Sequence, residues 1–239
     1  MIIFPAIDLK DGKCVRLYKG DFSKATIFNK SPFRQMQKFE KMGFKYLHLV
    51  DLDGALKGKS KNKKIILKIL KNKNLNVQLG GGIRTLKQIS FWIKNGVSKV
   101  ILGTTAINNP KILIKACSLY PKRIAVALDI RGKTIATNGW LQNTNTKLEK
   151  FIKNFARLDI CYFIITDIDR DGTKQGINLK KFKKILKITN IPLVASGGVK
   201  NISDIIRLKK IQNLAGVIVG RALYETNIKI IDLKKNNLI

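Results

Sequence analysis

The sequence predicts an α/β fold in which eight parallel strands, each followed by a helix, close into a barrel. Short apolar runs alternate with helical patterns along the chain, which is typical of strand–helix units and a parallel sheet. The chain also repeats itself once, because Asp8 and Asp129 each end an apolar strand and lie 121 residues apart. A length of 239 residues suits one α/β barrel domain covering the whole chain.

The internal repeat extends beyond the two aspartates. Further pairs are Gly81 with Gly197, Gly103 with Gly220, and Asp51 with Asp167, at offsets of 116, 117 and 116 residues. Such a period is far longer than the roughly 20 to 50 residues of solenoid repeats. Each half holds several strand–helix units, so we expect two similar half-barrels, at approximately 1–120 and 121–239.

The apolar runs place the strands, and capping signals place several helix ends. We expect strands at 2–7, 46–50, 77–79, 99–102, 124–128, 162–165, 193–195 and 217–219. One helix should begin after Ser31 with Pro32 and end before Gly43, and another should begin after Asn109 with Pro110. Further helices are expected at about 62–71, 86–95, 147–157, 179–188, 202–209 and 228–235. This order predicts a TIM (β/α)8 barrel, with its active site at the carboxyl ends of the strands.

The stretch 10–30 predicts the longest loop. It is long enough to act as a lid over the barrel mouth. The alternative is a small β-hairpin without a catalytic part.

Composition limits the kinds of partner. The net charge of +32 would suit nucleic acid, but the lysines are spread over the expected helices and occur with abundant Ile and Asn, a bias typical of AT-rich codons. We therefore expect no specific nucleic-acid binding and an anionic small-molecule substrate. Three separated cysteines, no leader pattern and no membrane-length apolar run predict a cytoplasmic protein without a membrane partner. A monomer is expected.

Asp8 and Asp129 are the candidate catalytic residues. A single aspartate at a strand end could merely cap the next loop. Two at equivalent positions of a repeat, on opposite sides of an eight-stranded ring, favour a general acid and base pair. No cluster of His, Cys or Glu near them suggests a metal site, so we expect proton transfer.

Glycine turns follow four of the expected strands. The candidates for phosphate binding are Gly81, Gly82, Gly103 and Thr104 in the first half, and Gly197, Gly198, Gly220 and Arg221 in the second. Glycine lets backbone N–H groups approach an anion closely. Tight turns also use glycine without any ligand, so the paired occurrence in both halves carries the prediction.

Other polar residues near the strand ends allow two interpretations. His48 is a candidate for substrate binding or a core residue, and Trp140 either stacks on a heterocycle or packs within its loop. Three aspartates at alternate positions, Asp167, Asp169 and Asp171, would suit a cation. No glutamate follows at the EF-hand spacing, so we do not expect calcium.

These motifs resemble the histidine-biosynthesis isomerases that convert the phosphoribosylformimino-aminoimidazole carboxamide ribotide (ProFAR) aminoaldose to its aminoketose. The resemblance covers essentially the whole chain. Its segments are 5–9, 10–17, 20–23, 48–52, 80–84, 138–140, 166–173, 196–199 and 216–223. Glu225 and Thr226 replace a Glu-Gly pair common after the last segment, a change we expect to affect only the final helix.

The resemblance implies an Amadori rearrangement without metal or organic cofactor. It implies that Asp8 accepts a proton, that Asp129 donates one, and that substrate contacts include Arg16, Thr166, Asp171 and Trp140. His48 and Arg84 complete our set of candidate substrate-binding residues. A substrate with a phosphate at each end would use both sets of glycine turns.

Two related activities stay open as alternatives. The cyclase subunit of imidazole glycerol phosphate synthase shares the barrel and the two aspartates, but position 16 is Arg where the cyclase pattern has a catalytic Lys. A bifunctional isomerase that also acts on phosphoribosyl anthranilate fits the same motifs.

Overall fold

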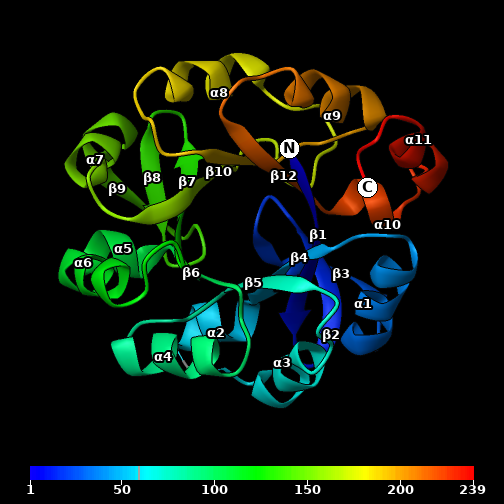
Figure 1. The fold of residues 1–239 in the computed structure, drawn as a ribbon, viewed down its shortest axis with the longest axis horizontal. Coiled ribbons are helices and arrows are strands. Elements are labelled where there is room, and N and C mark those ends of the chain that lie inside the picture. The colour runs from blue at the N-terminus through cyan, green and yellow to red at the C-terminus, as the bar shows by residue number, and fades with distance from the viewer. Residues whose placement is uncertain (59) are drawn as a thin grey trace.

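Eight parallel strands form a closed barrel in the computed structural model, which describes residues 1–58 and 60–239 (Figure 1). In ring order the strands are β1 (Ile2–Lys10), β4 (Tyr46–Asp51), β5 (Asn76–Gly80), β6 (Lys99–Leu102), β7 (Ile124–Arg131), β10 (Ile160–Asp167), β11 (Leu193–Ser196) and β12 (Leu214–Val219). β12 pairs with β1, with Ile2 opposite Gly216, and this pairing closes the ring. The predicted TIM barrel is confirmed.

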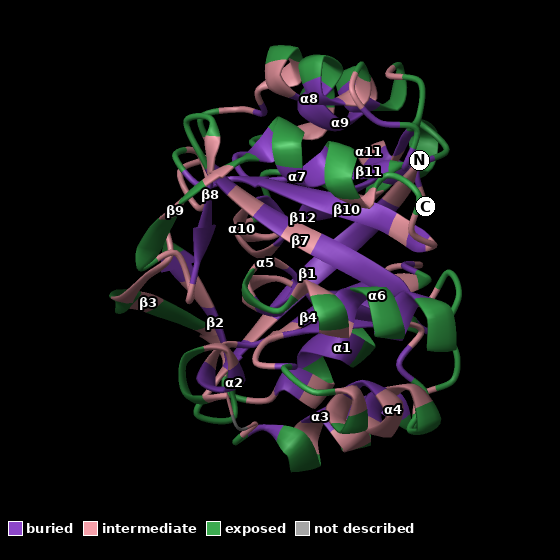
Figure 2. Cartoon of the chain, turned by 90° about the vertical axis from the view of Figure 1, so that its left-hand side faces the viewer, coloured by how far each residue is buried: buried purple, intermediate pink, exposed green. Residues whose placement is uncertain are grey.

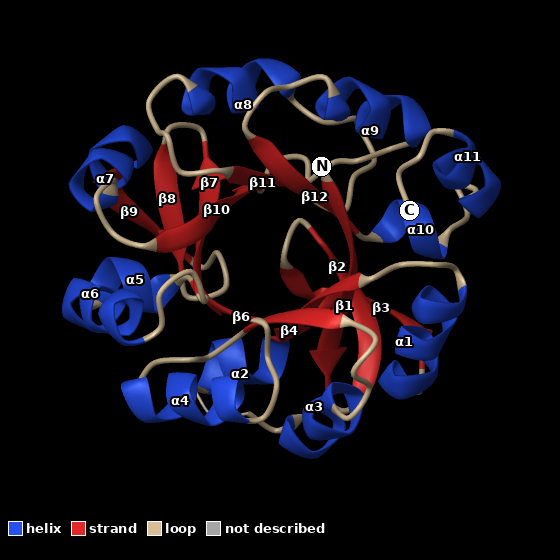
Figure 3. Ribbon diagram, in the orientation of Figure 1, coloured by secondary structure: helices blue, strands red, loops and turns tan. Residues whose placement is uncertain are grey.

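Helices surround the barrel on its outside (Figure 3). The longer ones are α1 (Pro32–Lys41), α3 (Lys63–Leu70), α4 (Leu86–Lys94), α6 (Pro110–Leu119), α7 (Leu148–Phe155), α8 (Leu179–Leu186), α9 (Ile202–Lys209) and α11 (Ile230–Lys235). Ser31 caps α1 as predicted, since its Oγ accepts a hydrogen bond from Arg34 N at 3.3 Å. None of the helices in the described ranges is long and apolar enough to cross a bilayer.

α6 begins at Pro110 with Asn109 as its N-cap residue, as predicted, but the Asn109 side chain makes no capping hydrogen bond. The short helix α5 (Thr104–Asn108) ends at this point, and Asn109 N donates to Thr105 O at 2.9 Å. Asn109 thus terminates one helix while Pro110 begins the next.

The stretch 10–30 is a β-hairpin rather than an irregular loop. β2 (Lys13–Tyr18) pairs antiparallel with β1 and with β3 (Asp21–Asn29). The second half contains a matching hairpin that the sequence did not predict, in which β8 (Thr134–Thr137) pairs with β7 and with β9 (Gln142–Lys147). Three short helices, α2 (Leu52–Lys57), α5 and α10 (Arg221–Tyr224), also lacked a sequence prediction.

The barrel strands consist largely of buried residues, drawn purple in Figure 2, and the buried apolar residues form two clusters. The larger cluster lies between strands and helices and includes Phe39, Leu49 and Phe182. The smaller cluster comes from inward-facing strand residues and is formed by Phe4, Ala6, Ile101, Ala125, Tyr162, Ile164, Val194 and Ile218. A filled barrel interior leaves ligand-sized space at the strand ends.

Candidate active site

A cavity of about 250 Å³ lies at the carboxyl ends of the barrel strands. All eight barrel strands contribute to its wall. The structure brings every candidate for catalysis or binding to this cavity, namely Asp8, Arg16, His48, Gly81, Gly82, Arg84, Gly103, Thr104, Asp129, Trp140, Thr166, Asp171, Gly197, Gly198, Gly220 and Arg221. The role of each residue stays a prediction.

The Asp8 and Asp129 side chains have different surroundings within this cavity. Asp8 Oδ2 accepts a hydrogen bond from Arg16 Nη1 at 2.5 Å, and the two side chains form an ion pair. Burial raises the pKa of Asp129, and hydrogen bonds from the Thr166 and Trp140 side chains offset only part of that rise. One carboxyl group has a cation beside it, whereas the other has a raised pKa.

Arg16 lies between Asp8, Tyr224 and the turn that follows β12. Its Cζ is 5.7 Å from the centroid of the Tyr224 ring, within the range of a cation–π interaction. A Cβ atom added at Gly220 would lie only 1.6 Å from Arg16 Nη2. Glycine at position 220 therefore leaves the space that the Arg16 guanidinium occupies beside Asp8.

Asp171 is a third carboxyl group in the cavity wall, and its pKa is raised to about 6. Burial is the main cause; Arg16 lowers the pKa, whereas the charges of Asp8 and Asp129 raise it further. The loop between β10 and α8, which carries Asp171, is tied to the first hairpin by a hydrogen bond from Lys19 N to Asp171 O at 3.2 Å.

We expect Asp171→Asn to raise the free energy of unfolding at pH 7.5 by about 1–2 kcal/mol. The pKa of this carboxyl group is about 6 in the folded protein, whereas an aspartate in an unfolded chain has a pKa of about 4. The wild-type protein therefore loses stability as the pH rises from about 4 to about 6, and the full loss is present above that range. Urea denaturation of both proteins measures the difference, which should shrink toward zero as the pH falls to about 4. An equal gain at both pH values would assign the effect to packing instead.

His48 presents a neutral imidazole to the cavity. Burial and the charge of Arg16 lower its pKa to about 3. Nδ1 is buried and has no hydrogen-bond partner in ranges 1–58 and 60–239. The side chain lies at the cavity wall and outside both apolar clusters.

Trp140 and Arg84 each pack against a glycine at the cavity. Trp140 lies in the turn of the second hairpin with φ +72°, and a Cβ added at Gly20 of the first hairpin would lie 2.1 Å from its ring. The Arg84 guanidinium lies against Gly58, and Nη2 donates to Ala55 O at 3.3 Å. Trp140 thus brings the two hairpins into contact, whereas one guanidinium nitrogen of Arg84 is bound to a backbone carbonyl oxygen.

The glycine turns of the two halves share one backbone geometry. Gly103 has φ −102° and ψ −103°, and Gly220 has φ −104° and ψ −107°. Gly81 and Gly197 have φ +100° and +92°. A Cβ added at Gly81 would lie 2.2 Å from Asp51 O, and one at Gly197 would lie 2.6 Å from Asp167 O. The sequence repeat is therefore also a structural repeat, with Asp51 and Asp167 behind the turns.

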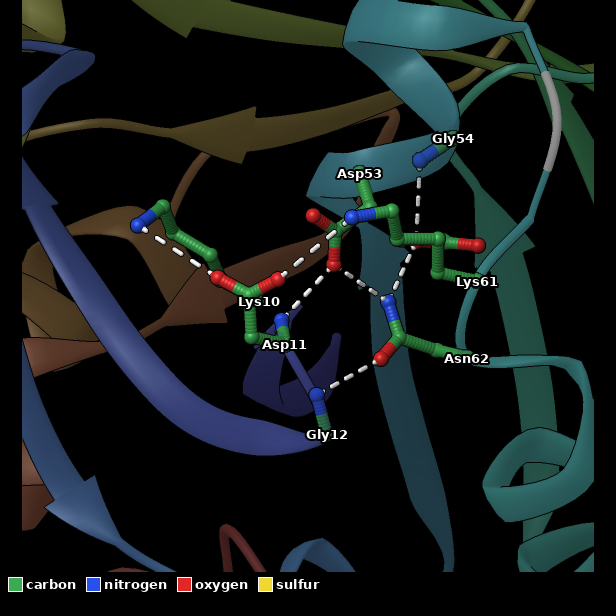
Figure 4. Close-up of polar contacts among 8 residues, drawn as sticks. Lys10, Asp11, Gly12, Asp53, Gly54, Lys61 and Asn62 are labelled. Carbon is green, nitrogen blue, oxygen red and sulfur yellow. Dashed lines mark hydrogen bonds and ion pairs between the residues drawn. The ribbon is translucent and has the colours of Figure 1, made fainter.

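A buried polar cluster supports the first of these turns (Figure 4). Asp51 Oδ1 accepts hydrogen bonds from Gly54 N at 3.0 Å and Asn62 Nδ2 at 2.6 Å. Asn62 also donates to Asp53 Oδ2 at 2.9 Å and accepts from Gly12 N at 2.9 Å. Asn62 therefore links the β1–β2 turn to the segment behind Gly81.

The second turn is supported by charged side chains instead. Asp167, which is 3% exposed at its side chain, pairs with Lys181 Nζ at 2.8 Å. Arg170 lies against Gly198 and donates from Nη1 to Gly176 O at 2.8 Å. Equivalent backbone positions in the two halves thus have different side-chain partners.

Comparisons with known proteins identify the family of this chain. The family model described as histidine biosynthesis protein matches residues 2–229. The chain belongs to the histidine biosynthesis protein family.

Members of the histidine biosynthesis protein family from several bacteria match nearly the whole chain. A Caulobacter vibrioides protein is 47% identical over 231 residues, covering 96% of each chain. A Prochlorococcus marinus protein is 44% identical, covering 100% of this chain and 94% of its own, and one from Mesorhizobium japonicum is 45% identical, covering 95% and 93%. All three are named 1-(5-phosphoribosyl)-5-((5-phosphoribosylamino)methylideneamino)imidazole-4-carboxamide isomerase.

Several residues that line the cavity were not predicted from the sequence. Lys174 lines the cavity only three positions after Asp171, so its loop position was a usable signal. Phe22 lines it from the first hairpin, where no sequence pattern distinguishes it from a packing residue. Among the described residues, no group of three His, Cys, Asp or Glu side chains is placed to hold a metal ion.

Proposed function

We propose that this chain is an aldose–ketose isomerase of histidine biosynthesis, which converts the ProFAR aminoaldose to the corresponding phosphoribulosyl aminoketose. The observation that carries the proposal is the unequal pair of carboxyl groups, Asp8 beside a cation and Asp129 with a raised pKa, facing one cavity. An acid and a base with different environments suit a proton-transfer reaction. The names of the relatives support the same activity.

In the proposed reaction, Asp129 is the acid and Asp8 is the base. Asp129 donates a proton to the ribose ring oxygen, the bond from C1 to that oxygen breaks, and the nitrogen lone pair forms a protonated Schiff base at C1. Asp8 removes the C2 proton, and the electrons of that C–H bond pass toward nitrogen to give an enolamine. Protonation of the enolamine at C1 and loss of the hydroxyl proton at C2 then give the aminoketose.

The paired glycine turns suit the two ends of a bisphosphorylated substrate. Backbone N–H groups of Gly81, Gly82, Gly103 and Thr104 would bind one phosphate, and those of Gly197, Gly198, Gly220 and Arg221 the other. Trp140 provides an aromatic face for the imidazole ring. Arg16, His48, Arg84, Thr166 and Asp171 are the proposed polar contacts between the two ends.

The proposal predicts turnover of the aminoaldose by the purified protein. We expect conversion to the aminoketose, measured by separating substrate and product chromatographically. Turnover of the aminoketose with ammonia, without conversion of the aminoaldose, would instead establish the cyclase activity. Phosphoribosyl anthranilate in a parallel assay distinguishes a single isomerase activity from a bifunctional one.

A further inference from the structure

Glu225 holds two cations at one end of the cavity. Its Oε2 pairs with Lys174 Nζ, and its Oε1 lies 2.9 Å from Arg221 Nε. Both cationic residues line the cavity, as do Gly198 and Gly220 of the second pair of turns. Two positive charges face one negative charge in this cluster, so one positive charge is left over.

Arg221 already directs its guanidinium toward acceptors of the protein. Nη1 donates to Gly172 O at 3.0 Å, and Nη2 donates to Thr26 Oγ1 at 3.4 Å. Nε lies 2.9 Å from Glu225 Oε1 in an ion pair but has no hydrogen-bond partner in ranges 1–58 and 60–239. Arg221 therefore ties the β10–α8 loop to the first hairpin, with two of its three guanidinium nitrogens bound to protein acceptors.

The Lys174 side chain has fewer protein partners than the Arg221 side chain. An ammonium group carries three donors, and Glu225 is its one hydrogen-bond partner within the described chain. The side chain is 32% exposed, so a pair of this kind adds little stability and leaves the ammonium free to contact a ligand as well. The backbone before it is fixed, because Thr173 Oγ1 donates to Arg170 O at 2.7 Å.

We propose that Lys174 is the side-chain ligand of the phosphate at the Gly197, Gly198 and Gly220 turns. This inference rests on the proposed function, which places a phosphate at these turns. Lysine binds phosphate as a point charge, and Glu225 keeps the ammonium at the cavity wall. Lys174 and Arg221 share the single negative charge of Glu225, so this pair of cations keeps a net positive charge that attracts the anion.

Steady-state kinetics with the aminoaldose test the role of Lys174. We expect Lys174→Gln to raise KM by about 10- to 100-fold and to leave kcat within about threefold, because a contact equal in ground and transition states affects binding alone. Lys200→Gln is the matched control, since it removes the same charge from an exposed lysine that follows Val199 without lining the cavity. Lys174→Arg keeps the charge and should lie closer to the wild type.

An unchanged KM in Lys174→Gln, or an equal rise in Lys200→Gln, would overturn the assignment. So would a loss in kcat with unchanged KM, since Lys174 would then act in the chemical step. Wild-type protein that fails to convert the aminoaldose would refute the proposed function instead, and a second measurement then still tests Lys174.

Crystals of the wild-type protein soaked in inorganic phosphate provide this measurement. We expect an anion at the second pair of turns with Lys174 Nζ within about 3 Å of a phosphate oxygen. An anion at these turns that lies beyond hydrogen-bond distance of Lys174, or no anion there at all, would overturn the assignment.

Discussion

Turnover of the Asp129→Asn variant should fall by about 10²- to 10⁴-fold, and that of Asp8→Asn by a similar factor. An amide of the same shape keeps the local packing but can neither donate the proton proposed for Asp129, whose pKa is raised, nor accept the proton proposed for Asp8. The kcat of each variant with the aminoaldose measures the loss of activity. The far-ultraviolet circular dichroism spectrum of the same variant shows whether its fold is intact.

Asp169→Asn is the matched control for these two variants. Asp169 is an exposed carboxylate in the β10–α8 loop and does not line the cavity, so its kcat should stay within about twofold of the wild type. If either strand-terminal variant kept near-normal turnover, that residue would have no acid–base role and the proposed mechanism would fail.

Gly81→Ala should lower the free energy of unfolding by at least about 3 kcal/mol. Gly81 has φ +100°, and an added Cβ would lie 2.2 Å from the backbone oxygen of Asp51, which sits on a buried strand and cannot move aside. Urea denaturation measures the loss. Activity should fall with it, because the same turn is proposed to bind phosphate.

Gly132→Ala separates steric clash from backbone strain. Gly132 also has a positive φ, +61°, but an added Cβ would have no neighbour within 4 Å. We expect a loss of only about 1 kcal/mol. Equal losses in the two variants would show that the contact between Gly81 and Asp51 has no special cost.

Apolar strands and their end residues were predictable because most of the barrel strands are largely buried on both faces and read as short apolar runs. The run at 125–128, Ala-Val-Ala-Leu, placed Asp129 at the cavity correctly. The second hairpin was missed because Gln142–Lys147 is a polar strand without a buried residue, so it carries no apolar signal. The glycines at 81 and 197 occupy turns where a Cβ atom would collide with the backbone oxygen of Asp51 or Asp167, so no other residue fits there.

Residues that act through tertiary contacts had no local signal. The polar bridge of Asn62 joins groups up to 50 positions apart in the sequence, and the Lys174–Glu225 pair spans 51 positions. Short helices such as α10 (Arg221–Tyr224) are also too brief to produce a helical period. The barrel and the residues that line its cavity could therefore be predicted from the sequence. The hydrogen bonds and ion pairs that hold those residues in place could not.

The matching φ and ψ angles at Gly103 and Gly220 bear on which end of a ligand binds at which pair of turns. A barrel with near twofold internal symmetry offers the same backbone to either end of a molecule that has like groups at both ends, so the turns alone do not distinguish head from tail. The orientation of such a ligand must therefore come from side chains that differ between the halves, among them Arg16 beside Asp8, Asp129 with its raised pKa, and the Lys174–Glu225 pair.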